Sequence, residues 1–156
     1  MSFLQKLIGA ALRPRVMAKA RGKSYADVII DLETSRDRLM PKIEAARDSA
    51  GNREALNHFV GIVRWSLSRI RVARGAKFVL DSYRGYRLPD TATLGELQQA
   101  FRDTRAESLA LAKRLEDEAV DRSFTVKHND LGDLTVIEWF VYLVDHSSRE
   151  IIRIRT

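Results

Sequence analysis

The helical character of this chain follows from the stretch Thr135-Val-Ile-Glu-Trp-Phe-Val-Tyr-Leu-Val-Asp-His-Ser-Ser-Arg-Glu150. Residues 135–138 have the pattern of a capping box, in which the threonine oxygen and the glutamate carboxylate satisfy otherwise unpaired backbone N–H groups. The apolar residues that follow cover a broad arc of a helical wheel drawn at about 100° per residue. The stretch therefore predicts a final helix that starts near residue 135 and runs almost to the end of the chain.

Three further bundle helices are expected before this one. Residues 24–27 have the pattern of a capping box and predict the start of the first helix. Pro41 either ends that helix or restarts a further turn after it. A second helix is expected from about Asn52 to Val72, with Gly75 as its stop. Residues 93–96 form a clear capping box that predicts the start of the third helix.

The two longest connections set the expected topology. Residues 77–91 contain two tyrosines, a glycine and a proline, and a long connection in an antiparallel bundle is usually a crossover or a lid. Residues 123–133 form the last loop, where Phe124-Thr-Val is a candidate for a short extended piece. No strand-like alternation competes elsewhere. We therefore predict an all-α, up-down-down-up four-helix bundle with an additional N-terminal helix.

The composition indicates one domain without a membrane span. The chain has 156 residues, of which 45% are hydrophobic and 31% charged, enough for one core and a solvated surface. No apolar run approaches the roughly 18 residues needed to cross a bilayer. The chain has no cysteine, which excludes disulfides, zinc–thiolate sites and cysteine nucleophiles and favours a cytoplasmic protein.

The net charge of +6 resides in residues 1–23. This segment has six basic residues and no acidic one, whereas the remaining 21 of the 27 basic residues balance the 21 acidic residues. Apolar residues from Phe3 to Leu12 recur at helical spacing, and Pro14 limits or kinks the expected helix. We therefore divide the chain into a basic amphipathic leader helix, residues 1–23, and a bundle domain, residues 24–156.

Three interpretations of the leader stay open. Its apolar stripe packs across the bundle or against a dimer partner, or the segment lies on an anionic membrane surface or ligand, or it is disordered. A secretory signal is not expected, because the apolar run is short and interrupted. Nucleic-acid binding is not expected either, because no recognised motif supports it and the excess charge is confined to one arm.

Three side chains that are able to bind a metal lie on two of the expected helices. His58 is on the second helix, and His146 and Glu150 are four residues apart on the last, so this pair shares one face. If the two helices are neighbours, the three side chains form a site of two imidazoles and one carboxylate. Such a donor set suits a zinc, iron, manganese or nickel ion with positions left open for chemistry.

A simpler interpretation of these residues needs no metal. His58 and His146 fall at the margins of the apolar arcs of their helices, where a histidine usually keeps one ring nitrogen in water. Glu150 has the spacing of an ion pair with His146, or with the arginines at positions 153 and 155.

Three stretches carry a family resemblance through their order and spacing. They are Asn52–Ile70, Thr93-Leu-Gly-Glu-Leu with Arg105 downstream, and His128–Ile154. Together they resemble the second helix, the third helix and the last loop and helix of the DinB-like superfamily. The resemblance covers roughly residues 25–156 and implies a small four-helix bundle.

The DinB-like resemblance also implies a ligand set. The usual ligands of that family are one histidine on the second helix and a histidine pair, four residues apart, on the fourth. His58 and His146 match the first two positions, and Glu150 stands where the third histidine is expected. A carboxylate also binds divalent metals, so the sequence is compatible with a changed site and with a degenerate one.

An activity is implied in the same way. Relatives include thiol-dependent transferases, isomerases and hydrolases that activate a small thiol at the metal. We therefore expect a hydrolase or a thiol-dependent transferase acting on a small molecule, with any thiol supplied by a cosubstrate because the chain has no cysteine. His128 is the candidate catalytic residue, as a proton carrier or as support for a ligand, and a solvated loop histidine is its alternative. Tyr83, Tyr86 and Trp65 are candidates for lining the pocket.

Two other functional classes stay open beside the enzyme. In one, the metal site is degenerate and the protein acts as a homodimer or by binding a partner, which the replacement of the third histidine by Glu150 favours. In the other, residues 1–23 make the chain a peripheral membrane-surface protein. The sequence contains no phosphate-binding glycine loop, no nucleophile elbow and no dinucleotide fingerprint.

Overall fold

The protein is mostly helical. The computed structural model describes residues 3–156, with side chains from residue 11 onward. The elements are α1 (Phe3–Ala20), α2 (Tyr25–Glu44), α3 (Ala50–Ile70), η1 (Arg71–Arg74), η2 (Tyr83–Tyr86), α4 (Leu94–Asp117), β1 (Thr125–His128), β2 (Gly132–Thr135), α5 (Val136–Glu150) and η3 (Ile151–Arg153). No helix among the described residues has both the length and the apolar character that crossing a bilayer requires.

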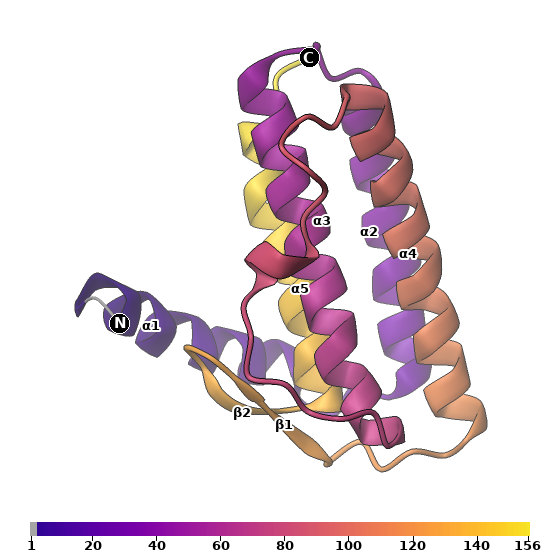
Figure 1. The fold of residues 1–156 in the computed structure, drawn as a ribbon. Helices are drawn as coiled ribbons and strands as arrows, with labels where there is room; N and C mark the ends of the chain where they lie inside the picture. Colours follow the sequence, from indigo (N-terminus) through magenta and orange to yellow (C-terminus); the bar gives the residue numbers. More distant parts are fainter. Residues whose placement is uncertain (1–2) are drawn as a thin grey trace.

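Helices α2 to α5 lie side by side and enclose the core (Figure 1). Helix α2 packs against α4 and α5, and α3 packs against the same two helices, so each helix has two neighbours. Figure 1 shows that α2 and α5 run toward the end that carries the C-terminus, whereas α3 and α4 run away from it. The order along the chain is therefore up, down, down, up, and the functional candidates on α3 and α5 face one another across an antiparallel pair.

Side-chain caps define where three of these helices begin. Ser24, Thr93 and Thr135 each accept a hydrogen bond from the backbone N–H three residues later, and the acidic side chain at that position accepts one from the backbone N–H of the cap residue. The three predicted capping boxes are thus confirmed. Each satisfies backbone donors that the first helical turn leaves unpaired, an effect worth about 1 kcal/mol per helix.

The buried apolar residues form two clusters along the bundle. One contains Trp65, Trp139 and Leu143 and lies toward the hairpin, and the other contains Phe59 and Phe101 and lies toward the C-terminus. Burial of such side chains contributes about 1.5–3 kcal/mol for each Leu or Phe. His146 lies where the two clusters meet, between Phe59 of one and Tyr142 of the other.

Two prolines lie inside helices. Helix α1 continues past Pro14 to Ala20, and α2 continues past Pro41 to Glu44. A proline removes one backbone hydrogen bond, but a helix with tertiary contacts beyond the proline retains its remaining turns. Pro14 therefore does not limit the leader helix, and Pro41 does not end α2, which runs through it to Glu44 without a break.

The connection between α3 and α4 is a crossover that runs along α3 (Figure 1). Gly75 ends η1 with a left-handed φ of 89°, a conformation that favours glycine. Farther along, the chain passes directly over Gly61, where an added Cβ would lie 3.0 Å from the carbonyl oxygen of Tyr83 and 2.8 Å from Cγ of Arg87. Gly61 therefore allows the crossover to lie close against α3.

A β-hairpin departs from the all-α prediction. Strands β1 and β2 pair in antiparallel fashion, with Thr125 opposite Thr135 and His128 opposite Gly132. Only the first strand coincides with the extended piece predicted near Phe124. The indole N–H of Trp139 donates to the carbonyl of Val126 at 3.0 Å, which ties the hairpin to the start of α5. Two four-residue strands are too short for an alternating pattern to identify in sequence.

The described part of residues 1–23 packs on the bundle. Val16 and Ala20 are buried, and Arg15 and Lys19 both donate to the carboxylate of Asp145 on α5. For this part the structure matches the interpretation in which the leader packs across the bundle. The side chains of Phe3, Leu4, Leu7 and Ile8, which carry most of the predicted apolar stripe, lie outside the described residues.

Candidate metal centre

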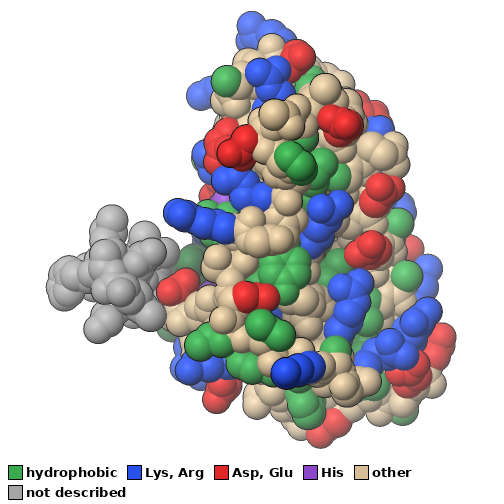
Figure 2. All heavy atoms as spheres, in the orientation of Figure 1, with side chains coloured by type: hydrophobic (Ala, Val, Ile, Leu, Met, Phe, Trp, Pro, Cys, Tyr) green, Lys and Arg blue, Asp and Glu red, His purple; other side chains and the backbone are tan. Residues whose placement is uncertain are grey.

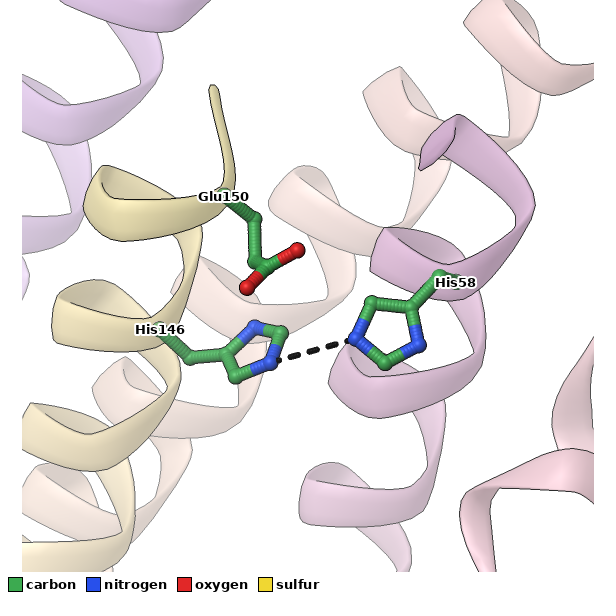
Figure 3. A group of neighbouring side chains, drawn as sticks. All are labelled: His58, His146 and Glu150. Atoms are coloured by element: carbon green, nitrogen blue, oxygen red, sulfur yellow. Dashed lines mark hydrogen bonds between the residues drawn. The ribbon is translucent and has the colours of Figure 1, made fainter. Parts of the chain in front are cut away.

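His58, His146 and Glu150 come together between α3 and α5 (Figure 3). The helices are antiparallel neighbours, so an early residue of α3 lies level with the last turns of α5. Figure 3 shows the three side chains pointing toward one another. One donor atom from each lies within 4.8 Å of the other two. The sequence predicts that these three side chains meet only if the two helices are neighbours, and in the structure the helices are neighbours and the side chains meet.

The distance between the two imidazoles suits shared coordination. The Nε2 atoms of His58 and His146 are 3.3 Å apart. Two nitrogens that each lie about 2.0–2.1 Å from a tetrahedral ion are separated by about 3.3 Å. The same distance also suits a hydrogen bond between one protonated and one unprotonated nitrogen. The pair therefore has the spacing of metal ligands, and an imidazole–imidazole hydrogen bond is the competing arrangement.

The two rings differ in burial. His146 is 8% exposed, with Phe59 and Tyr142 at ring-centroid distances of 6.5 and 5.9 Å. His58 is half-buried, and the ring of Tyr83 from the crossover stands edge-on to it at 4.9 Å. The Nδ1 atom of His146 is buried without a hydrogen-bond partner among the described residues. One end of the site is thus sealed by aromatic rings, and the end at His58 is reached from the crossover.

Burial keeps both histidines neutral at physiological pH. Desolvation lowers the pKa of His146 to about 3, with a smaller effect from the nearby His58. The pKa of His58 is lowered in the same direction by desolvation, with Arg153 and Arg87 also disfavouring its charged form and Glu150 opposing them. A metal binds the neutral imidazole, so the surroundings hold these rings in the form that coordinates.

Glu150 is shared between this cluster and the surface. Burial acts to raise the pKa of Glu150, but the hydrogen bond from Arg153 and the neighbouring histidines outweigh it, so the pKa is lowered. Arg153 donates to Oε2 at 2.7 Å, the ion pair anticipated from the spacing. A carboxylate has lone pairs for both an arginine and a metal, so the pair does not exclude coordination.

His128 lies in a different, aromatic environment. Its ring centroid is within 5.0 Å of those of Trp65, Trp139 and Tyr142. Its Nδ1 accepts the backbone N–H groups of Asp130 and Leu131, at 3.0 and 3.1 Å. It is only 4% exposed, so the alternative of a solvated loop histidine is wrong.

The pKa of His128 is lowered to about 3 by desolvation and by the charge of Arg69. Tyr142 contacts the rings of both His128 and His146 and thus separates His128 from the cluster. The Nε2 atom of His128 has no hydrogen-bond partner among the described residues. A catalytic role for His128 stays a prediction, and such a role would act through the Tyr142 side of the site.

The three aromatic candidates for the pocket separate. Tyr83 contacts His58, Trp65 contacts His128, and Tyr86 donates its hydroxyl to Asp81 at 2.6 Å. Phe59 and Tyr142, which line the buried side of the cluster, were not anticipated as site residues. The position of Tyr142 four residues before His146 is a signal in the sequence, since residues at that spacing share a helix face. Phe59 reaches His146 from the neighbouring helix, and its position beside His58 in the sequence gives no such signal.

No family model, no curated protein and no solved structure matches this chain.

Proposed function

We propose that His58, His146 and Glu150 hold a divalent metal ion, and that the chain is a DinB-like metal-binding protein. The convergence of three donor atoms within 4.8 Å of one another carries the proposal. Two imidazoles and a carboxylate suit zinc, iron, manganese or nickel, and three protein ligands leave a position open for a substrate. A structural site would be closed by a fourth protein ligand, so the donor set favours chemistry over a purely structural role.

The fold supports this proposal. The up, down, down, up order of α2 to α5, with a crossover between α3 and α4, is the arrangement expected for a four-helix bundle of the DinB-like type. The candidate ligands lie on the second and fourth of these helices, as the resemblance implies. Helix α1 is then an addition outside that bundle.

We propose a metal-dependent hydrolase or a thiol-dependent transferase acting on a small molecule. A bound divalent ion supplies Lewis acidity at such a site and lowers the pKa of a water or thiol. The carboxylate of Glu150 accepts a hydrogen bond from Arg153, and the rings of Phe59 and Tyr142 exclude water from the buried side. Any thiol belongs to a cosubstrate, because the chain has no cysteine.

An open groove offers a route for the substrate. It has a volume of about 620 Å³, and Tyr83, Arg84 and Arg87 line it together with Glu54. Tyr83 also touches His58, so the groove and the cluster share a side chain. A groove of this size accommodates a small molecule better than a polymer.

Elemental analysis of protein purified without a histidine tag tests the metal site. We expect close to one zinc, iron, manganese or nickel ion per chain, and loss of that ion in His58→Ala and in Glu150→Ala. His128→Asn is the matched control, because it removes a buried imidazole outside the cluster and should keep the metal. Protein that stays metal-free after reconstitution with each of these ions contradicts the proposal.

A non-catalytic bundle is the second candidate. The ion pair between Glu150 and Arg153 favours it, because a carboxylate neutralised by an arginine is a weaker ligand. In this case the site is degenerate, and the protein works as a homodimer or by binding a partner. Light scattering that gives a dimer mass, together with no bound metal, would favour this candidate over the enzyme.

A peripheral membrane protein acting through residues 1–23 is the third candidate, and nucleic acid is not a proposed partner. On the face drawn in Figure 2, Lys and Arg side chains are interspersed with Asp and Glu rather than gathered in one basic patch. Electrostatic binding to nucleic acid needs a continuous basic surface.

We propose a cytoplasmic location on the absence of cysteine alone.

A further inference from the structure

A second cavity lies on the opposite side of α5 from the metal cluster. It has a volume of about 430 Å³ and is bordered by α1, α2 and α5. Ser148 lines it, and at about 100° per residue Ser148 lies about 200° around the helix from His146. The cavity is therefore separate from the candidate metal centre, although both use α5.

One buried carboxylate in this cavity faces three cations. Asp145 is 3% exposed, and it accepts from Arg15 and Lys19 of α1 and from Arg149 of its own helix. The distances from the Nε atoms of Arg15 and Arg149 to its oxygens are 3.1 and 3.0 Å. One carboxylate neutralises one positive charge, so the group around Asp145 has an excess of two, although of its cations only Lys19 lines the cavity itself.

Other residues that line the cavity add one further positive charge. Lys23 pairs with Asp31 at 2.7 Å and is balanced by it. Arg38 donates only to the hydroxyl of Ser148, so its charge has no carboxylate partner among the described residues. The cavity and its immediate surroundings thus hold five cations and two carboxylates: Arg15, Lys19, Lys23, Arg38 and Arg149 with Asp31 and Asp145.

An unsatisfied hydroxyl lies in the wall of the same cavity. Ser35 is 2% exposed, and its Oγ has no hydrogen-bond partner within the described part of the chain. A buried polar atom without a partner costs about 1–3 kcal/mol, so such an atom usually bonds to water or to a ligand. Thr34 is the next residue and also lines the cavity, whereas Val141 and Val144 make its apolar side.

We propose that the cavity between α1, α2 and α5 binds the phosphate group of a small phosphate-bearing molecule. The excess positive charge favours a dianion over a neutral ligand. Arg38, Lys19 and the hydroxyl of Ser35 supply several donors from two helices, which suits a group with three acceptor oxygens. The two valines cover a short carbon skeleton. This site is independent of the metal centre and of its chemistry.

Calorimetric titration of the full chain with inorganic phosphate and with glycerol 3-phosphate tests this site. We expect saturable binding, weaker by roughly tenfold in Arg38→Gln and by a smaller factor in Ser35→Ala. Arg36→Gln is the matched control, because it removes an equal charge from the same helix at a residue that pairs with Asp37 and does not line the cavity, and it should bind like wild type. Circular dichroism on each variant confirms folding, and Ser35→Ala removes a single oxygen from the wall.

A second arm distinguishes a free ligand from a lipid headgroup. The same variants are assayed for binding to vesicles of phosphatidic acid in phosphatidylcholine. Binding of the soluble probes, weakened in Arg38→Gln and Ser35→Ala, assigns the cavity to free small molecules. Binding to vesicles alone, weakened by the same two substitutions, assigns it to a lipid phosphate. Absence of both, or equal weakening by Arg36→Gln, overturns the proposal.

Discussion

Two buried histidines of this protein, His128 and His146, have the same titration behaviour and opposite surroundings. Burial lowers the pKa of each to about 3, and Tyr142 touches both rings. His128 uses Nδ1 to close a turn of the hairpin, among aromatic rings. His146 instead faces a second imidazole and a carboxylate. A shifted pKa reports burial in both places, and only the convergence of donors distinguishes a candidate metal ligand from a structural residue.

The comparison assigns stability to the His128 surroundings and ligand binding to the His146 surroundings. The largest effect should come from Trp139→Ala, which we expect to lower the free energy of unfolding by about 3–5 kcal/mol. Trp139 is fully buried, packs on His128 and holds the hairpin through Val126. Chemical denaturation measures this loss. A similar loss from His58→Ala in metal-free protein would remove the distinction between the two regions.

Zinc should stabilise the protein through the cluster alone. At a free concentration of 100 times Kd, we expect zinc to raise the free energy of unfolding by about 2.7 kcal/mol, because the ion binds only the folded site. Thermal unfolding with and without zinc measures the effect. His146→Ala should abolish it and His128→Asn should keep it. Equal stabilisation of wild type and His146→Ala would show that zinc binds elsewhere.

Acid should destabilise the metal-free protein through both histidines. Each folded-state pKa of about 3 lies below the ordinary value of 6.5, so between these values the unfolded chain binds protons that the folded chain does not. The stability that each neutral histidine contributes to the free energy of unfolding is fully present above pH 6.5. It is lost as pH falls toward 3, by roughly 1 kcal/mol per pH unit for each histidine.

Denaturation at a series of pH values measures this slope. His128→Asn should remove the part of the pH dependence that His128 contributes. The asparagine oxygen still accepts the N–H groups of Asp130 and Leu131 but does not titrate. An unchanged slope in this variant would contradict the buried, neutral state of His128.

The smallest expected effect concerns the competition between Arg153 and a metal ion for the carboxylate of Glu150. Arg153→Gln should free the carboxylate and strengthen zinc binding by less than about fivefold, since an exposed ion pair is worth at most about 1 kcal/mol. Competition with a chelating dye measures the zinc Kd. Arg155→Gln is the control, because Arg155 is exposed and lies two positions beyond the end of η3. Weaker zinc binding in Arg153→Gln would mean that the arginine positions the ligand.

Much of the helical framework could be predicted because its signals are local. The capping boxes at Ser24, Thr93 and Thr135 depend on residues three apart, and the structure has all three. The hairpin was missed in part, because β2 is four residues long and its pairing with β1 is decided by the packing of Trp139 rather than by alternation. The continuation of α1 past Pro14 was equally hidden, because Asp145, which binds that helix, lies at the other end of the chain.

The sequence by itself determined the helices and the shared face of His146 and Glu150, since each depends on residues within about a turn of one another. It also determined the neutral charge of residues 24–156, which depends on composition alone. Only the tertiary structure decided that His58 lies 3.3 Å from His146, that His128 is sealed among aromatic rings, and that basic residues of α1 and α2 line one cavity. These are contacts between residues far apart in the chain. Their formation depends on how the apolar faces of several helices pack together, which a pattern within one helix does not specify.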